Sequence, residues 1–201
     1  QTDEDFDLIY LDPARRNEHQ QKGFLLSDCT PDIVQLLPTS LKKSHQVMVK
    51  TSPMMDIELA LKELKNVHEV HVVSVDNECK EVLYLINNAL STDVSIHSVN
   101  FKNSIKEVYS TTWSERNNPD ISLSDPETYL YEPNASLMKA GTHSAAAMAY
   151  GLKKLHPNTH LYTNDQLIET FPGRIFKVNQ VVSLNKKELK KLLPHAKANI
   201  T

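Results

Sequence analysis

The chain has 201 residues, 40% of them hydrophobic, and a net charge of −3, a composition typical of a globular domain rather than a disordered or fibrous chain. It contains no run of about 18 apolar residues, so we expect no membrane span. The start at Gln1–Asp5 lacks the basic and apolar regions of a signal peptide. The two cysteines of the chain define neither a disulfide framework nor a zinc-ligand spacing. We therefore expect a cytoplasmic protein with no membrane partner and no metal site.

The charge is distributed unevenly along the chain. Residues 1–138 carry 12 Lys and Arg against 22 Asp and Glu, a net charge of −10. Residues 139–201 carry 10 basic against 3 acidic residues, a net charge of +7. This split suggests two units with different partners. A basic unit can bind nucleic acid by neutralising phosphates, although a lysine-rich helix can also serve solubility alone.

The first half of the chain predicts an open α/β sheet. Short apolar or alternating runs predict strands, and apolar residues at helical spacing predict helices, with Asp56 as an N-cap. The predicted elements are strands over residues 6–11, 45–50, 67–75 and 81–86 and helices over residues 36–43 and 56–64. Asp76-Asn77-Glu78 has the composition of a tight turn, so the last two strands should form an antiparallel hairpin at the edge of an otherwise parallel sheet.

The second half predicts another hairpin, a linker and a small α/β unit. The hairpin should span residues 94–112, followed by a polar linker over residues 116–128. Beyond the linker, partly helical structure is expected in 137–155, strands over 161–163 and 174–183, and a lysine-rich helix over 185–193. The predicted organisation is therefore a domain over residues 1–115, a linker, and a basic domain over residues 129–201.

The segment Asp12-Pro13-Ala14-Arg15-Arg16 directly follows the first predicted strand. Ligands of open α/β sheets bind outside the carboxyl ends of the strands. Pro13 has a fixed φ and no N–H, so the turn is stiff and can hold the Asp12 carboxylate towards an amine or a cofactor. Alternatively, Asp12-Pro13 simply ends the strand, and the short pattern taken alone favours that interpretation.

Several segments together resemble one family. FDLIYLDPARR resembles motif IV of class I S-adenosylmethionine (SAM)-dependent methyltransferases, and more closely the bacterial ones with a THUMP-like C-terminal domain, which carry Asp-Pro-Ala-Arg-Arg at this strand end. The similarity continues, in the same order, through VMVKTSPMMDI, SVDNECKEVLYLI, YLYEPNASLMKAG and FPGRIFKV. The resemblance implies a partial Rossmann-like methyltransferase sheet followed by a small α/β THUMP-like domain, with SAM as cofactor and RNA as the substrate and partner.

The chain also departs from the family pattern. It has four glycines and no Gly-x-Gly, whereas these methyltransferases hold SAM with a glycine-rich turn after their first strand. The resemblance therefore implies that SAM is bound mostly by residues preceding Gln1, and that the chain alone is inactive. The segment Lys50–Pro53 lacks the cysteine nucleophile that C5-pyrimidine methyltransferases need, which disfavours a covalent mechanism. We expect Cys29 and Cys79 to be inert, small apolar residues.

The site residues follow from these patterns. The resemblance implies that the catalytic pocket is lined by Asp12, Pro13, Ala14 and Arg15. Substrate contacts are expected from Arg16, Lys50, Ser52, Asp56, Arg174, Lys177, Lys186, Lys187, Lys190 and Lys191. Ser52 and Asp56 could instead be ordinary helix caps and Lys50 a solvated side chain.

Two further interpretations stay open or are disfavoured. The rival to the enzyme is a non-enzymatic RNA-binding or interaction module on a degenerate methyltransferase fold. A metal site is not expected from the histidines, because His68 and His71, three residues apart in a strand, should point to opposite faces of the sheet.

Overall fold

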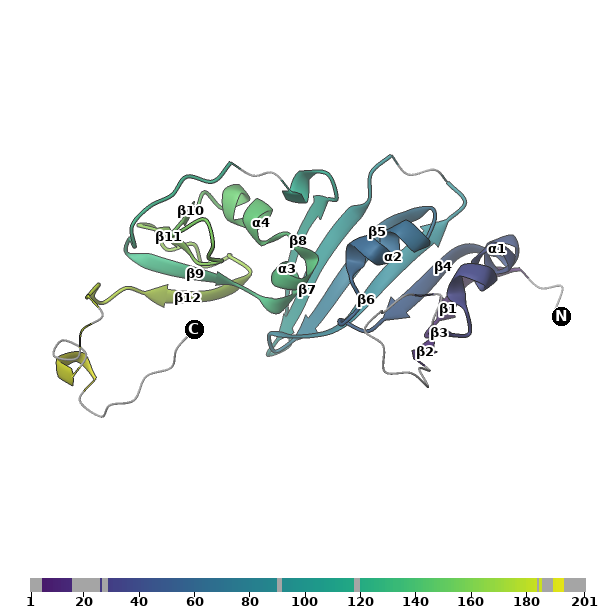
Figure 1. Ribbon diagram of the computed structural model, residues 1–201, viewed down its shortest axis with the longest axis horizontal. Coiled ribbons are helices and arrows are strands. Elements are labelled where there is room, and N and C mark those ends of the chain that lie inside the picture. Colours follow the sequence, from purple (N-terminus) through teal and green to yellow (C-terminus); the bar gives the residue numbers. More distant parts are fainter. Residues whose placement is uncertain are drawn as a thin grey trace.

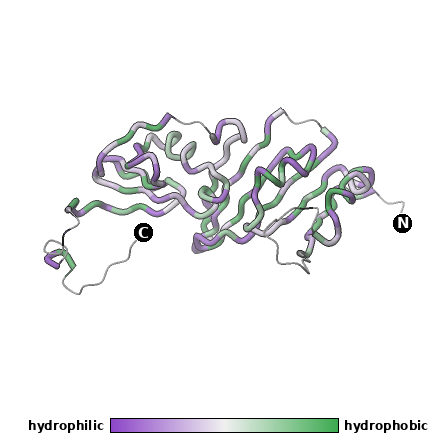
Figure 2. The backbone as a smooth tube through the Cα atoms, viewed as in Figure 1, coloured by the Kyte–Doolittle hydropathy of each residue, from purple (hydrophilic) through white to green (hydrophobic). Residues whose placement is uncertain are grey.

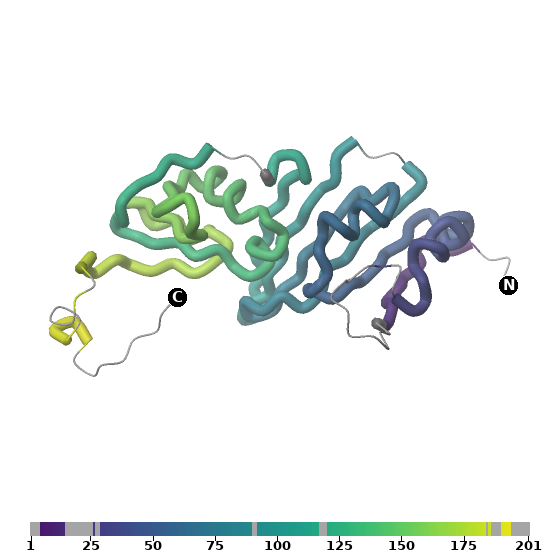
Figure 3. The backbone as a smooth tube through the Cα atoms, in the orientation of Figure 1, coloured from purple at the N-terminus to yellow at the C-terminus, as the bar shows by residue number. Residues whose placement is uncertain are grey.

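Two β-sheets lie end to end along the long axis of the molecule (Figure 1). The protein is described by a computed structural model over residues 5–15, 26, 29–89, 92–117, 120–183, 185 and 190–193. The larger sheet is built from the earlier, purple to teal part of the chain and the smaller sheet from the later, green to yellow part, as Figure 3 shows. None of the helices in these ranges has the length and hydropathy needed to cross a bilayer.

The larger sheet has six strands in the order β1-β4-β6-β5-β7-β8. The strands are β1 (Phe6–Leu11), β4 (Ser44–Thr51), β5 (Val67–Val75), β6 (Glu78–Asn87), β7 (Ser95–Lys102) and β8 (Ile105–Thr112). β1 pairs with β4 and β5 with β7 in parallel, and the remaining pairs are antiparallel. The predicted parallel pairing of the first two long strands is therefore confirmed, as are both hairpins.

The predicted position of the first hairpin was wrong. β6 lies between β4 and β5, and β7 and β8 extend the sheet beyond β5, so the β5–β6 hairpin is internal. Local pairing in the hairpin leaves one edge of each strand free, and both edges are used: β6 pairs with β4 and β5 with β7. The alternation of Val82, Tyr84 and Ile86, all fully buried, fits this internal position.

Three helices cover one face of the larger sheet: α1 (Ile33–Lys43), α2 (Ile57–Glu63) and α3 (Ala135–Ala140). α1 begins three residues before the predicted start because the Asp32 carboxylate accepts the Gln35 N–H and caps the helix. Buried side chains such as Val49 and Val72 alternate along the strands and pack beneath the helices. Figure 2 shows the resulting mixture of hydrophobic and hydrophilic positions along each element.

The smaller sheet is antiparallel, with strand order β10-β11-β9-β12. Its strands are β9 (Tyr129–Pro133), β10 (Lys153–Lys154), β11 (Tyr162–Asn164) and β12 (Gly173–Lys177), and α4 (His143–Ala149) packs beside it. Tyr131, Tyr162 and Phe171 form its buried core. The strand predicted over residues 174–183 ends at Lys177, and of the predicted lysine-rich helix the described residues show a helical turn over 190–192.

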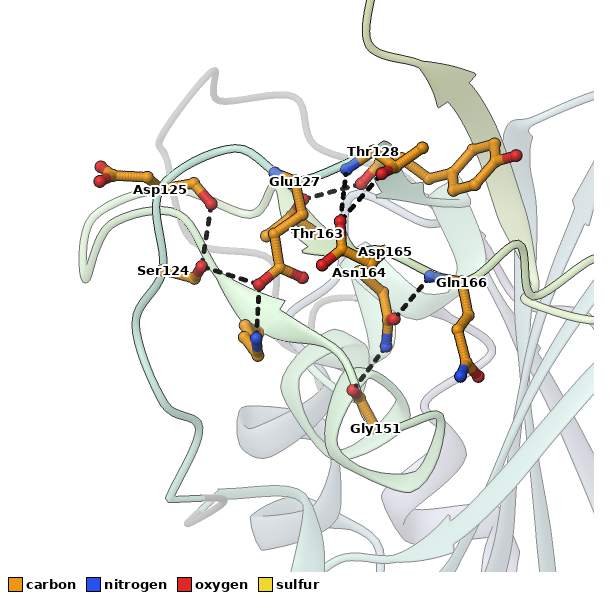
Figure 4. Close-up of polar contacts among 11 residues, drawn as sticks. Ser124, Asp125, Glu127, Thr128, Gly151, Thr163, Asn164, Asp165 and Gln166 are labelled. Carbon is orange, nitrogen blue, oxygen red and sulfur yellow. Dashed lines mark hydrogen bonds and ion pairs between the residues drawn. The ribbon is translucent and has the colours of Figure 1, made fainter.

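The predicted linker is attached to the smaller sheet over its second half. The Ser124 N–H donates to the carbonyl of Lys154 at 3.0 Å, and the Glu127 N–H donates to Thr163 Oγ1 at 2.8 Å. Thr128 donates to the Asp165 carboxylate through both its N–H and its hydroxyl, as Figure 4 shows. These bonds fix the chain before β9 begins.

α3 joins the two parts of the molecule. It follows β9 of the smaller sheet but packs on β5, β6 and β7 of the larger one, where Ala140 belongs to the larger core. The buried hydroxyls of Ser98 on β7 and Thr142 after α3 are hydrogen-bonded at 2.9 Å. The smaller sheet is therefore held firmly against the larger one.

Candidate functional site

An ion pair stands at the carboxyl end of β1 and β4. Because these strands are parallel, with Leu11 opposite Val49, Asp12 and Lys50 emerge at the same edge of the sheet. Lys50 Nζ lies 2.6 Å from Asp12 Oδ2. The hydrogen bond to Asp12 raises the pKa of the Lys50 ammonium, which therefore stays charged. The side chain of Asp12 remains 48% exposed, so one side of the carboxylate faces solvent.

A pocket of about 270 Å³ surrounds this pair. Its walls are Asp12, Pro13, Cys29, Lys50, Thr51, Ser52, Pro53, Met55, Lys80 and Glu81. Four of the residues predicted from sequence, Asp12, Pro13, Lys50 and Ser52, are thus brought together. A pocket of this size is at the small end of ligand sites and suits one ring or one amino group rather than a whole nucleoside cofactor.

The segment after Pro13 folds back to form one side of the site. β2 (Ala14–Arg15) pairs with β3 (Cys29–Thr30), placing Arg15 opposite Cys29 in the ladder. Ala14 is exposed and does not line the pocket, whereas the Arg15 side chain and all of Arg16 lie outside the described residues. Cys29, which was expected to be an inert, small apolar residue, is buried and lines the pocket.

Ser52 and Asp56 have clear structural roles. Ser52 Oγ accepts the Met54 N–H at 3.2 Å in the turn after β4. The Asp56 carboxylate accepts the Leu59 N–H at 2.8 Å and caps α2, and Asp56 is not among the pocket residues. The capping alternative is therefore shown for Asp56, while Ser52 both shapes the turn and lines the pocket.

Sequence reasoning missed the contribution of β6 to the site. Lys80 and Glu81 line the pocket because β6 is inserted next to β4, with Val82 opposite Thr51. From the sequence, Lys80 and Glu81 were expected only as part of a hairpin at the sheet edge. The alternation of three large apolar residues in 82–86 indicates a strand with one covered face, but it does not tell an internal strand from an edge strand, so no local signal placed Lys80 and Glu81 beside β4.

The C-terminal part also contacts the pocket wall. Lys139 on α3 donates to the Met55 carbonyl at 2.7 Å, and Met55 itself is 3% exposed and lines the pocket. α3 is thus connected to the pocket wall by a hydrogen bond.

A second pocket of about 380 Å³ lies on the same edge of the sheet. It is formed where β5 and β7 end and includes Asp76, Asn77 and Lys102, with Arg174 from β12 on the far side. β1, β4, β5 and β7 all run in one direction, so both pockets lie at the carboxyl edge. Arg174 also binds Glu132 at 2.5 Å, a contact that raises the pKa of the guanidinium and keeps the arginine charged.

Of the remaining predicted substrate contacts, those that the structure describes are not gathered around either pocket. Lys177 is exposed at the end of β12, and Lys190 and Lys191 are exposed in the C-terminal helical turn. This turn lies at the opposite end of the molecule from β1 (Figure 1). Lys186 and Lys187 lie outside the described residues.

Comparisons with known proteins agree with this architecture. A family model described as a ferredoxin-like domain matches residues 129–172. The crystal structure of a candidate methyltransferase from Porphyromonas gingivalis W83 is similar, with a TM-score of 0.84 and 34% sequence identity, over 94% of this chain and 47% of that one. The chain thus spans about half the length of that protein. No curated protein matches the chain.

The fold is therefore methyltransferase-like, as the sequence predicted: a mixed α/β sheet with parallel strands followed by a small antiparallel sheet.

Proposed function

We propose that this chain forms the acceptor-binding part of a SAM-dependent methyltransferase that acts on RNA. The observation that carries the proposal is the Asp12–Lys50 pair in its pocket at the carboxyl edge of two parallel strands. That edge is where open α/β sheets bind ligands. The 34% identity to a candidate methyltransferase supports the same reaction class.

The residues of the pocket suit an N–H group of a nucleobase. The Asp12 carboxylate, paired with Lys50, can accept a hydrogen bond from such a group and fix its orientation. Pro13 stiffens the turn that carries this carboxylate. The small volume fits one base turned out of its stack, which is how enzymes reach an atom on a base.

The three glycines that the structure describes do not provide the expected SAM-binding turn. Gly141 ends α3 in the left-handed conformation, Gly151 follows α4 with φ of 66°, and Gly173 packs against β9, while Gly23 lies outside the described residues. SAM supplies an electrophilic methyl group when bound, and in our proposal its adenosine is held by residues outside this chain. The chain contributes orientation of the acceptor and exclusion of water.

The ferredoxin-like part is assigned to RNA binding in this proposal, as a domain of the THUMP-like type. Residues 139–201 carry a net charge of +7 from 10 basic and 3 acidic residues, and such a surface attracts phosphates. Arg174 stands in the second pocket of the carboxyl edge, so an RNA strand with one base at Asp12 could continue along this edge towards Arg174.

Two binding measurements test this proposal. Calorimetry on the 201-residue chain should show no SAM binding in the low-micromolar range, whereas a chain extended upstream of Gln1 by a strand and a Gly-x-Gly turn should bind. Tight binding by the shorter chain would contradict our assignment of the SAM site. An extended chain that binds RNA but not SAM would favour the non-enzymatic RNA-binding module.

The second measurement is a filter-binding titration with structured RNA at two salt concentrations. Changing Lys186, Lys187, Lys190 and Lys191 together to Glu should remove most binding, and the wild-type affinity should fall steeply with salt because each neutralised phosphate releases counterions. A control with the same charge change at exposed Lys42, Lys62, Lys65 and Lys106 should retain more affinity. Equal affinity of both variants and the wild type, with no salt dependence, would refute RNA binding by this unit.

A further inference from the structure

Two histidines and a glutamate converge on the face of the larger sheet opposite its helices. β5 and β7 pair in parallel with His71 directly opposite His97, and Glu69 lies two residues before His71. Their neighbours Val70, Val72 and Ile96 are fully buried beneath the helices. Because successive side chains of a strand point to opposite faces, the glutamate and the two histidines lie on the other face of the sheet. All three are partly exposed, which leaves them open to a small ion.

The three groups present their ligand atoms to one point. Glu69 Oε2 lies 2.8 Å from His71 Nε2 and 3.8 Å from His97 Nε2, and all three ligand atoms are within 4.8 Å of one another. The two imidazole rings are stacked, with centroids 4.4 Å apart and planes inclined by 25°. The ligand atoms of a tetrahedral zinc ion are about 3.3 Å apart, given bonds of about 2.0–2.1 Å, so small side-chain rotations would admit the ion.

We propose that Glu69, His71 and His97 bind a divalent transition-metal ion of the zinc type. Two imidazoles and one carboxylate are ligands that Zn²⁺ and Co²⁺ prefer, whereas Mg²⁺ and Ca²⁺ prefer sites built from oxygen. Three protein ligands leave one tetrahedral position for water or another ligand.

A second layer of contacts orients the ligands. Ser110 Oγ on β8 is 2.8 Å from His97 Nδ1, which leaves Nε2 of that ring turned towards Glu69. Protein metal sites use such bonds to the second ring nitrogen to fix the orientation of a histidine ligand. His68 Nε2 lies 4.0 Å from the other carboxylate oxygen of Glu69 and 3.0 Å from Gln46 Nε2. The cluster is therefore built across four strands.

The structure also explains why sequence spacing did not reveal the cluster. His68 and His71 were expected on opposite faces, but both reach the Glu69 carboxylate. The pairing of β5 with β6 shifts register between Val67 and Glu69, an irregularity that breaks the simple alternation at His68. His97 comes from a strand 26 residues further on, and only the β5–β7 pairing brings it to His71.

The decisive experiment is zinc titration of the tag-free 201-residue chain by calorimetry, with Co²⁺ absorption as an independent report of coordination. We expect one ion per chain. Glu69→Gln, His71→Ala and His97→Ala should each weaken Zn²⁺ binding by at least about tenfold, and Ser110→Ala by a smaller factor. His45→Ala, which removes an exposed histidine on β4 of the same sheet, should bind as the wild type does.

Circular dichroism shows whether a variant that binds zinc weakly is still folded. If a histidine variant unfolds, the test rests on Glu69→Gln, which keeps the size of the side chain. Zinc should raise the melting temperature of the wild type and of His45→Ala but not of Glu69→Gln. Zinc binding of equal strength and stoichiometry in Glu69→Gln and the wild type, or no binding by the wild type at micromolar Zn²⁺, would overturn the proposal. The outcome does not depend on whether the protein methylates RNA.

Discussion

Asn134 holds the junction between the two sheets, and its replacement by Ala should destabilise the protein by about 2–3 kcal/mol. Its side chain is 2% exposed and caps the six-residue helix α3 by accepting the Leu137 N–H at 3.1 Å. The same oxygen accepts the hydroxyl of Ser136 at 2.7 Å, and the amide donates to Glu107 at 3.1 Å. Because a helix of six residues has little stability of its own, the loss of its cap should lower the stability of the protein.

The magnitude follows from two losses. Removing an N-cap costs about 1 kcal/mol. Ser136 is fully buried, and leaving its hydroxyl without an acceptor costs about 1–2 kcal/mol more. Glu107 also accepts from Asn100 at 2.8 Å, so its contribution should be small.

Urea denaturation followed by circular dichroism measures the effect, with a double-mutant cycle as the control. Ser136→Ala should cost less than Asn134→Ala. When Ser136→Ala is added to Asn134→Ala, it should cost nearly nothing, because it removes the hydroxyl that Asn134→Ala leaves without an acceptor. A loss below about 0.5 kcal/mol for Asn134→Ala, or strictly additive losses in the cycle, would refute this reasoning.

Two further predictions concern stability. Burial lowers the pKa of His143 to about 4 from 6.5, so the unfolded chain binds a proton between these values that the native chain does not, and stability should be lost as pH falls from about 6.5 towards 4. The full shift corresponds to about 3.4 kcal/mol, which solvent screening of this partly exposed ring reduces to about 1–2 kcal/mol. Unfolding free energies at pH 7 and pH 4.5 should differ less in His143→Gln than in the wild type, and an unchanged difference would contradict the assignment. A Cβ on Gly173 would lie 2.1 Å from the Glu132 carbonyl oxygen, so Gly173→Ala should lower stability by about 2 kcal/mol or more. Gly151→Ala, which meets no atom within 4 Å and bears only its positive φ, should cost about 1 kcal/mol, and equal melting temperatures of the two variants would disprove the clash.

The sequence was most informative where local chemistry sets the structure. The apolar run 6–11 ending in Asp12-Pro13 predicted β1 and the position of Asp12 at a sheet edge. Asp56 was identified as a cap from its place before an amphipathic helix. In each case neighbouring residues determine the outcome, so no knowledge of distant pairing was needed.

Features that depend on distant pairing could not be predicted in the same way. A hairpin has the same local pattern at the edge and in the middle of a sheet, so the insertion of β6 beside β4, and with it Lys80 and Glu81 at the pocket, was missed. Cys29 reaches the pocket through the short β2–β3 ladder, and strands of two residues each have too short a pattern to be predicted from sequence. The docking of α3 on the larger sheet crosses the predicted linker and has no signature in the charge pattern.

The central claim is that Asp12 orients the acceptor of a methyl transfer, and transfer of labelled methyl from SAM to RNA tests it most directly. The assay uses this chain joined to its SAM-binding half, in the wild type, in Asp12→Asn and in a control, Glu58→Gln, which removes an exposed carboxylate on α2. We predict that the wild type and the control incorporate label equally and that Asp12→Asn loses about 100-fold or more of the rate, the effect expected for a positioned group at the reacting atom. Full transfer by Asp12→Asn, or no transfer to RNA by a wild type that binds SAM, would contradict the account.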